Sequence, residues 1–316
     1  MGSHAWLELD TGTGFDTSIV VKTNVAEVLR RELARPSWRH EQVALGTNTD
    51  PYQRVEGRYR LMPGVITALA DSGTPLSILT KGTLLQRDLP LLSAVASYAG
   101  VGLGVSIAIG DPALHASLEP GTPSPRARLG LVRAIRKAGL ECGVMVAPVL
   151  PWLTDITEEL DALLGRIAAV GATGASVLPL HLRPGAREWY FGWLRKHRPD
   201  LVTRYDHLYA SGAYAATWYP RLLDERVGPL LVRHGLGLAD TRVVASTSGS
   251  SSSVRRRSRR ASGRRRRFAV GRRGQRRRHH SVGCSDSHQH RRRINVTAPR
   301  TWTHRRWAPR PRRRPR

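Results

Sequence analysis

Short apolar runs rich in β-branched residues alternate with amphipathic segments between residues 18 and 183. The runs begin near residues 42, 75, 101, 141 and 175, so their spacings are 33, 26, 40 and 34 residues. Each spacing is the length of one strand plus a crossover helix. Because the runs are apolar on both faces, they are typical of parallel strands covered by helices. The pattern therefore predicts a repeated βα unit, preceded by a further strand at 18–21.

The expected helix boundaries support the same organisation. Amphipathic stretches predict helices at residues 25–33, 63–70, 89–98, 125–138 and 158–170. Ser124 and Pro125 supply an N-cap and a first-turn proline, while Gly139 and Gly171 stand where two helices should end. The sequence contains no GxGxxG or Walker loop, which argues against dinucleotide-binding and P-loop folds. An open parallel sheet and a barrel both fit the periodicity.

Polar residues follow each expected strand, at the end where parallel α/β folds bind their ligands. The polar segments are residues 46–53, 80–82, 111–112, 118–129, 148–155 and 179–184. Ordinary turn formation explains any single loop. Their recurrence along one rim favours a binding site. There, Lys81, Arg126 and Arg128 would hold a carboxylate or phosphate. Asn48, Asp50 and Glu119 would accept hydrogen bonds from an amine or a ribose hydroxyl.

Positive charge is concentrated at the C-terminal end. The formal net charge is +27, yet residues 1–240 hold 25 basic and 23 acidic groups, whereas residues 241–316 hold 26 arginines and one acid, Asp286. The tail also lacks Leu, Met, Tyr, Lys and Glu. It cannot bury enough apolar surface to offset the entropy of ordering itself. We therefore expect a disordered tail behind a body long enough for one α/β barrel or a large doubly wound domain.

The cysteine content and hydropathy bear on the compartment. Cys142 and Cys284 are too few for a disulfide framework or for a thiolate cage built from this chain alone, and a reducing cytoplasm fits best. No stretch approaches the roughly 18 uninterrupted apolar residues of a membrane span. The first 20 residues lack a basic stretch followed by an apolar run. The sequence predicts a cytoplasmic protein that is not exported and does not span a membrane.

Several of the polar loops together form a familiar set. They are Gly46-Thr47-Asn48-Thr49-Asp50-Pro51-Tyr52-Gln53 with Glu56, Thr80-Lys81, Leu118-Glu119-Pro120, Ser124-Pro125, Arg128-Leu129 and Pro148 to Asp155. This set resembles the radical S-adenosylmethionine superfamily, in particular the spore photoproduct lyase-like branch of DNA repair photolyase-like proteins. The resemblance covers residues 5–237, and the Thr-Asp-Pro-Tyr-Gln segment is its most specific part.

The resemblance implies an α/β fold, a partial (β/α)₆ TIM-like barrel whose open top binds a [4Fe-4S] cluster and S-adenosylmethionine. In that superfamily an adenosyl radical abstracts hydrogen from a substrate, and the protein supplies position and exclusion of water. Carried over residue by residue, the cofactor wall consists of Asn48, Asp50, Tyr52, Gln53, Thr80, Lys81, Ser106, Glu119 and Arg128. For Thr80 and Ser106, ordinary strand packing explains the residue equally well.

One departure from the family pattern bears on activity. The family holds its cluster with three thiolates in a Cys-xxx-Cys-xx-Cys loop, and this chain has no cysteine before Cys142. Such clusters are held chiefly by Cys thiolates, and Cys142 lies in an expected buried strand, where an inert apolar role is favoured. We therefore expect this chain not to assemble the cluster and to be inactive. Its start at Met1-Gly2-Ser3-His4 looks like a truncation just after the family's loop, or like the remnant of an expression tag.

These features divide the chain into four expected segments. They are a remnant at 1–17, a radical SAM-like partial barrel at 18–183, an aromatic-rich helical cap at 184–240 and the basic tail at 241–316. Residues 184–220 hold nine of the chain's 19 aromatic residues. We favour packing of this cap against the barrel. The alternative is a platform on which nucleic-acid bases stack.

The basic tail leaves further hypotheses open. Its abrupt onset after Leu238 resembles a GC-rich gene read in a shifted frame, and we favour that interpretation over a function. If the tail is genuine, its arginine runs should bind nucleic acid through phosphates, without sequence preference and in a salt-sensitive way. The chain would then be a degenerate adenosyl-binding protein with a nucleic-acid-binding arm. An ordinary barrel hydrolase or aldolase is a third hypothesis.

Overall fold

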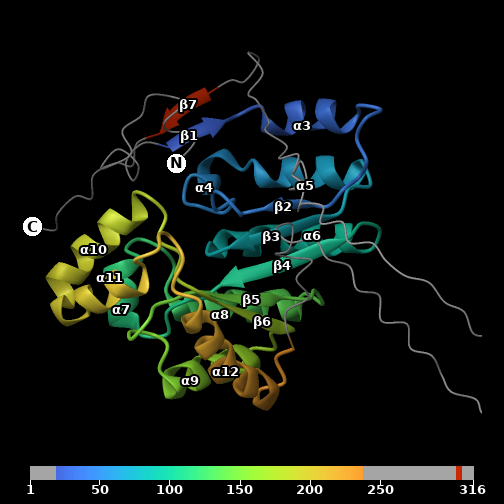
Figure 1. Cartoon of the computed structure of the whole chain (residues 1–316). Helices are drawn as coiled ribbons and strands as arrows, with labels where there is room; N and C mark the ends of the chain where they lie inside the picture. Colours follow the sequence, from blue (N-terminus) through green and yellow to red (C-terminus); the bar gives the residue numbers. More distant parts are fainter. Residues whose placement is uncertain (1–18, 238–303, 308–316) are drawn as a thin grey trace, which may run out of the picture. The chain divides into compact units, whose positions relative to one another are not determined.

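The structure, a computed structural model, describes residues 19–237 and 304–307. Five of its strands form one parallel sheet in the order β2-β3-β4-β5-β6 (Figure 1). They are β2 (Val43–Leu45), β3 (Leu76–Thr80), β4 (Val101–Ser106), β5 (Gly143–Val149) and β6 (Gly174–Pro179). Each strand neighbours the next one in the chain, as in successive units of a β/α barrel. The predicted partial TIM-like barrel is confirmed.

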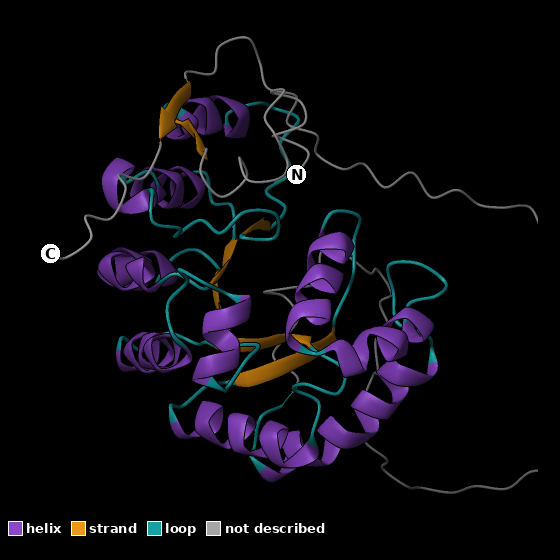
Figure 2. Ribbon diagram, turned by 90° about the vertical axis from the view of Figure 1, so that its left-hand side faces the viewer, coloured by secondary structure: helices purple, strands orange, loops and turns teal. Residues whose placement is uncertain are grey.

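One helix precedes β2, and the others fill the connections between these strands. They are α3 (Val25–Leu33), α4 (Glu56–Tyr59), α5 (Met62–Asp71), α6 (Leu89–Ala96), α7 (Pro112–Leu118), α8 (Pro125–Lys137) and α9 (Thr157–Ala169), with the 3₁₀ helix η1 (Thr83–Asp88). Figure 2 shows a row of helices along one side of the strands. Between these helices and the sheet lies the main core, which includes Ile66, Ile78, Val105, Ile135 and Val144. Strand side chains alternate between faces, so the intervening positions face away from this core.

The predicted helix ends are also confirmed. Ser124 accepts a hydrogen bond at its hydroxyl from the Ala127 amide at 3.2 Å, and Pro125 begins α8. Gly139 and Gly171 have φ angles of +79° and +83°. Only glycine adopts this left-handed conformation without strain, which is why it follows helices so often.

The strand expected at 18–21 forms as β1 (Ile19–Lys22), but it does not join the parallel sheet. It pairs antiparallel with β7 (His304–Trp307), with Ile19 opposite Trp307. This second strand falls inside the segment expected to be disordered. The remainder of that segment and residues 1–18 lie outside the described residues, so the expectations about them stay predictions.

The helices after β6 are α10 (Ala186–His197), α11 (Val202–Leu208) and α12 (Trp218–Arg233), with the 3₁₀ helix η2 (Pro199–Leu201). Their buried aromatic residues form a second core with residues that follow β4 and β5; the aromatic members are Tyr190, Phe191, Tyr205, Tyr209 and Tyr219. The Tyr205 hydroxyl donates to the Pro151 carbonyl at 2.7 Å. These five aromatics therefore pack, as favoured from the sequence, and are not open to bases. None of the described helices combines the length and apolar character needed to cross a membrane.

Candidate functional site

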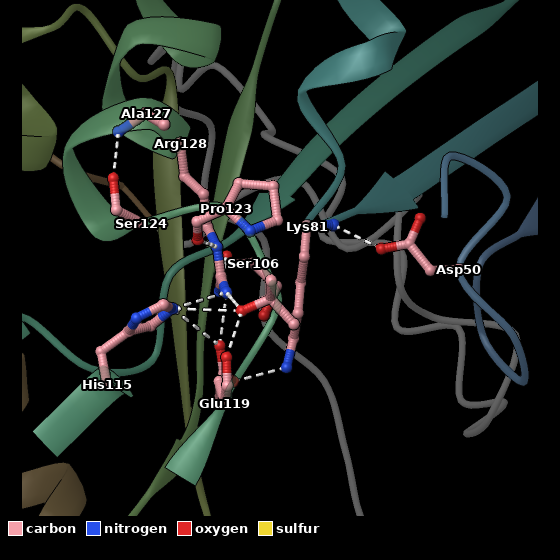
Figure 3. Close-up of polar contacts among 10 residues, drawn as sticks. Asp50, Lys81, Ser106, His115, Glu119, Pro123, Ser124, Ala127 and Arg128 are labelled. Carbon is pink, nitrogen blue, oxygen red and sulfur yellow. Dashed lines mark hydrogen bonds and ion pairs between the residues drawn. The ribbon is translucent and has the colours of Figure 1, made fainter. Parts of the chain in front are cut away.

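Asp50 ties the loop after β2 to the end of β3. One carboxylate oxygen accepts from the Tyr52 amide at 2.9 Å and from the Thr80 hydroxyl at 2.5 Å, and the other accepts from the Lys81 amide at 2.7 Å (Figure 3). Gly46 makes this close approach feasible. Its φ is +100°, and an added Cβ would lie 1.9 Å from a carbonyl oxygen of β3. The first polar loop is thereby held against the second.

Lys81 and Glu119 form an ion pair on the same rim. The Lys81 ammonium donates to Glu119 Oε1 at 2.5 Å, and the two side chains are 34% and 12% exposed. Behind them, Arg128 donates to the other oxygen of Glu119 from the first turn of α8 (Figure 3). Arg128 is only 1% exposed. The Glu119 carboxylate thus lies between an accessible cation and a buried one.

Arg128 is fully engaged with its own surroundings. It donates to the carbonyl oxygens of Pro123 at 2.8 Å and Ser106 at 3.0 Å, and to the Thr122 hydroxyl at 2.7 Å. One guanidinium nitrogen also lies 3.1 Å from His115 Nε2. Because a guanidinium group only donates, His115 Nε2 must be the acceptor. The proton of the neutral His115 ring is therefore assigned to Nδ1. Arg128 therefore positions Glu119, and Ser106 contributes through its carbonyl oxygen.

Two pKa shifts accompany this arrangement. Burial, and then the Arg128 charge, lower the pKa of His115, which favours the neutral ring that the geometry requires. Burial alone would raise the pKa of Glu119, but Lys81 and Arg128 together hold it below its usual value. Glu119 is therefore ionised at neutral pH. A cation and an anion side by side at an accessible rim can hold the carboxylate and the ammonium of an α-amino acid group.

Three other side chains of the expected wall, those of Tyr52, Asn48 and Gln53, are not hydrogen-bonded to Lys81, Glu119 or Arg128 among the described residues. Tyr52 is buried, and its hydroxyl donates to the Asp88 carboxylate at 3.1 Å. Arg87 donates two hydrogen bonds to the same carboxylate, at 2.7 Å and 2.8 Å. Burial, followed by the Asp88 charge, raises the pKa of Tyr52. Tyr52 thus anchors the loop from within. Asn48 is exposed and Gln53 is half-buried. Within the described chain, no hydrogen bond or ion pair joins either side chain to the Lys81–Glu119 pair.

The sheet face opposite the helices carries unusually small side chains. The strand register places Gly104 beside Gly143 and Gly143 beside Gly174, so three neighbouring strands present a row of glycines. On this face the hydroxyls of Ser77 and Ser176 are buried, and neither has a hydrogen-bond partner among the described residues. Leaving a buried hydroxyl unsatisfied costs about 1 to 3 kcal/mol. These two hydroxyls leave the face with unused hydrogen-bonding capacity among the described residues.

An iron-sulfur cluster is not accommodated by the residues present. Of the two cysteines in the chain, Cys284 lies outside the described residues and Cys142 is fully buried. Burial raises the pKa of the Cys142 thiol to about 12. Within residues 19–237 and 304–307, no three His, Cys, Asp or Glu side chains are grouped so that they could hold a metal ion. This chain does not offer the three thiolates that such a cluster needs.

Sequence reasoning missed two members of the network, His115 and Thr122. The available signal was that His115 precedes Glu119 by four residues, the spacing that places two side chains on one helical face. The helix that contains it, α7, is only seven residues long. Its start is marked in sequence by Asp111 and Pro112. The Asp111 carboxylate accepts from the Leu114 amide at 2.6 Å.

The partial barrel with its polar rim places the chain, by its fold, beside spore photoproduct lyase. A solved double mutant of spore photoproduct lyase with bound AdoMet and dinucleoside spore photoproduct superposes with a TM-score of 0.50 and 17% sequence identity. The match covers 67% of this chain and 63% of the lyase, so the chain spans less than two thirds of that protein. At this identity the likeness establishes the fold.

Comparison of sequences places the chain more narrowly. No family model matches it. It is 62% identical over 234 residues to uncharacterized proteins of Mycobacterium tuberculosis and Mycobacterium bovis, covering 74% of this chain and 69% of each relative. The chain belongs to the family of these mycobacterial proteins. An uncharacterized protein of Acidianus two-tailed virus is 30% identical over 149 residues, which is 46% of this chain and 48% of the viral protein.

Proposed function

We propose that the body binds S-adenosylmethionine at the carboxyl ends of β2, β3 and β4, as a radical SAM-like protein related to the DNA repair photolyase-like branch. The observation that supports this most strongly is the linked set of Asp50, Lys81, Glu119 and Arg128. Asp50 and Lys81 follow β2 and β3, Glu119 caps the end of α7 and Arg128 lies in the first turn of α8, yet the four form one continuous series of contacts.

Each residue of the set has a distinct part in the proposed binding. Lys81 takes the carboxylate of the methionyl group and Glu119 takes its ammonium. Arg128 keeps Glu119 ionised and oriented, while Asp50 fixes the backbone from which Lys81 extends. The adenosyl part would lie against the face of the sheet that carries Ser77, Ser176 and the glycine row. The solved lyase of similar fold carries AdoMet, which makes this cofactor the first to test.

The radical chemistry of the superfamily depends on an electron from a reduced cluster, which this chain lacks the thiolates to hold. We therefore expect this chain to bind S-adenosylmethionine without cleaving it. In this proposal the residues of the chain are sufficient for binding the cofactor, whereas catalysis would also need the cluster.

Isothermal titration of the full chain with S-adenosylmethionine tests the proposal. Lys81→Met removes the accessible cation but leaves the backbone contact with Asp50 intact. We expect it to weaken binding about tenfold, the effect of losing one charge-assisted hydrogen bond. Lys137→Met is the matched control, because Lys137 is exposed in the last turn of α8 and should leave binding unchanged. Circular dichroism confirms that each variant is folded.

Two results would contradict the proposal. One is the absence of any heat of binding with the folded wild-type chain at millimolar S-adenosylmethionine. The other is an equal affinity of wild type and Lys81→Met. S-Adenosylhomocysteine, which retains the amino acid group but lacks the sulfonium charge, should still require Lys81.

The arginine-rich tail remains a proposed nucleic-acid-binding segment, supported by its composition of 26 arginines and one acid. Such binding works through phosphates and falls steeply with salt. Filter binding of a duplex at low and high salt, with and without residues 241–316, tests this. DNA association that survives deletion of the tail, or that ignores salt, would exclude the proposed arm.

A further inference from the structure

A groove of about 500 Å³ lies between the helical cap and the loop after β5, and its lining does not include Asp50, Lys81, Glu119 or Arg128. It is lined by the loop after β5 and by the beginnings of α9, α11 and α12. Two tryptophans, Trp152 and Trp218, face it together with three arginines, Arg198, Arg204 and Arg226. Trp218 is 51% exposed. Large exposed aromatics beside cations are typical of ligand-binding surfaces rather than of packing.

The charges of the groove divide into satisfied and available groups. Arg198 is engaged by Asp200 through two hydrogen bonds of 3.0 and 2.7 Å, so this pair is neutral overall. Asp155 is buried, and it accepts from the Tyr219 hydroxyl at 3.0 Å and from a backbone amide of its own loop at 2.8 Å. Its carboxylate is therefore turned into the protein. It does not present a free negative charge to a ligand.

Arg204 and Arg226 keep donors available. Arg204 is exposed and stacks over Trp152, with its guanidinium carbon 5.6 Å from the ring centroid. Within the described chain no ion pair or hydrogen bond engages it. Arg226 uses one nitrogen, Nη1, to donate to the Asp155 carbonyl at 2.9 Å, and the same nitrogen lies 3.5 Å from the Asp155 carboxylate in an ion pair. Its side chain is 35% exposed, and its other two nitrogens make no hydrogen bond or ion pair with the described residues. Two guanidinium groups with free donors suit a phosphate, which accepts bidentate hydrogen bonds.

The start of α9 is a poor alternative place for that phosphate. Its first turn carries Glu158, which lines the same groove, and Glu159. Both already complement the helix dipole and would repel a second anion at this end of the groove. The anionic end of a ligand therefore belongs beside Arg204 and Arg226. A planar group of the same ligand can then stack on Trp218.

We propose that this groove binds a nucleotide, with its phosphate on Arg204 and Arg226 and its base on Trp218. The volume lies within the usual range of small-molecule sites, about 300 to 1,000 Å³. A free mononucleotide and one unit of a single strand share this chemistry. This proposal is independent of S-adenosylmethionine binding at the rim. S-Adenosylmethionine has a base but no phosphate, so it lacks the group that Arg204 and Arg226 would bind.

Titration of the full chain with AMP in about 0.15 M salt, where the Debye length is about 8 Å, tests the groove. Arg204→Gln and Trp218→Ala should each weaken AMP binding about tenfold, through loss of the phosphate contact and of base stacking. Arg221→Gln is the control, because Arg221 is exposed on α12 and does not line the groove. Trp218→Phe should retain most of the affinity. All variants keep the same tail, so any tail contribution cancels.

Adenosine and inorganic phosphate serve as separate probes, and each alone should bind more weakly than AMP. An oligothymidylate distinguishes the two sources of a nucleotide. If Arg204→Gln and Trp218→Ala weaken its binding as well, the groove takes a strand; if only AMP binding falls, it takes a free nucleotide. The inference is overturned if folded wild type does not bind AMP, if both substitutions leave AMP affinity unchanged, or if phosphate alone binds as tightly.

Failure of this inference is distinguishable from failure of the proposed function. Lys81→Met should lose affinity for S-adenosylmethionine and keep that for AMP, whereas Arg204→Gln should do the reverse. If Lys81→Met abolished AMP binding, AMP would be bound at the rim, and the assignment to the groove would be wrong.

Discussion

Removing Arg128 should destabilise the protein, and the size of the effect follows from its contacts. Breaking a buried ion pair by deleting one partner costs about 3 to 5 kcal/mol. In Arg128→Met, Glu119 keeps Lys81 as a partner, so we expect the lower end, near 3 kcal/mol. In Glu119→Gln, the fully buried guanidinium loses its only carboxylate among the described residues. Glu119→Gln should therefore lower the free energy of unfolding by about 5 kcal/mol, the upper end of this range.

Urea denaturation followed by circular dichroism measures both changes. Arg133→Met is the matched control, because Arg133 lies exposed on the same helix and should change stability by less than about 0.5 kcal/mol. In thermal unfolding, a loss of 3 kcal/mol corresponds to about 6 to 12 °C for a body of this size. The double variant Arg128→Met, Glu119→Gln should lose less stability than the two single variants added together, because the two residues interact directly. A loss below about 1 kcal/mol for Arg128→Met, or the reverse order of the two variants, would refute the buried network.

Three further predictions concern the rim and the core. Burial alone would raise the pKa of Glu119, but Lys81 and Arg128 hold it below the value of the unfolded chain. The ionised carboxylate therefore stabilises the folded protein at any pH above the unfolded pKa. This contribution is lost as the pH falls through the folded pKa. Melting temperatures measured from neutral to acid pH should therefore fall more in wild type than in Glu119→Gln. Gly46→Ala should lower the free energy of unfolding, measured in urea titrations, by at least about 3 kcal/mol, because the backbone would be strained and the new methyl group would collide with β3. Gly130→Ala is the control: Gly130 has open space around it, and the change should raise the free energy of unfolding by about 0.5 to 1 kcal/mol. In a Cys284→Ser background, Ellman's reagent should label Cys142 only after unfolding, because the native thiol is buried with a pKa of about 12; rapid native labelling would contradict this.

The repeat of strands and helices could be predicted because its signals are local. Residues 101–106 and 143–149 are short apolar runs, and Ser124 and Gly139 mark the two ends of one helix. Strand pairing between distant segments has no such local signal. The strand at Ile19–Lys22 was expected, yet its partner His304–Trp307 lies far along the chain and is mostly basic.

Convergence of the site could be predicted, but the pairings within it could not. The rule that ligands bind where parallel strands end places Asp50, Lys81 and Glu119 on one rim. Sequence could not show that Lys81 and Glu119 contact each other, or that Arg128 and Tyr52 are buried. An arginine in the first turn of a helix normally faces water. Here, acceptors from three separate segments surround it, and that depends on tertiary structure alone.

The contacts of Glu119 lead to one further expectation about the site. Its two carboxylate oxygens are held by Lys81 and Arg128, both residues of this chain, so we expect the charges that would receive an amino acid group to be in place before a cofactor arrives. Affinity for S-adenosylmethionine should therefore be the same before and after anaerobic incubation with iron and sulfide. The protein should stay colourless, because its buried Cys142 cannot join a three-thiolate set. A brown protein whose affinity for the cofactor rises on incubation would show that cluster and ligand are bound cooperatively by this chain, contrary to the independence inferred from Glu119.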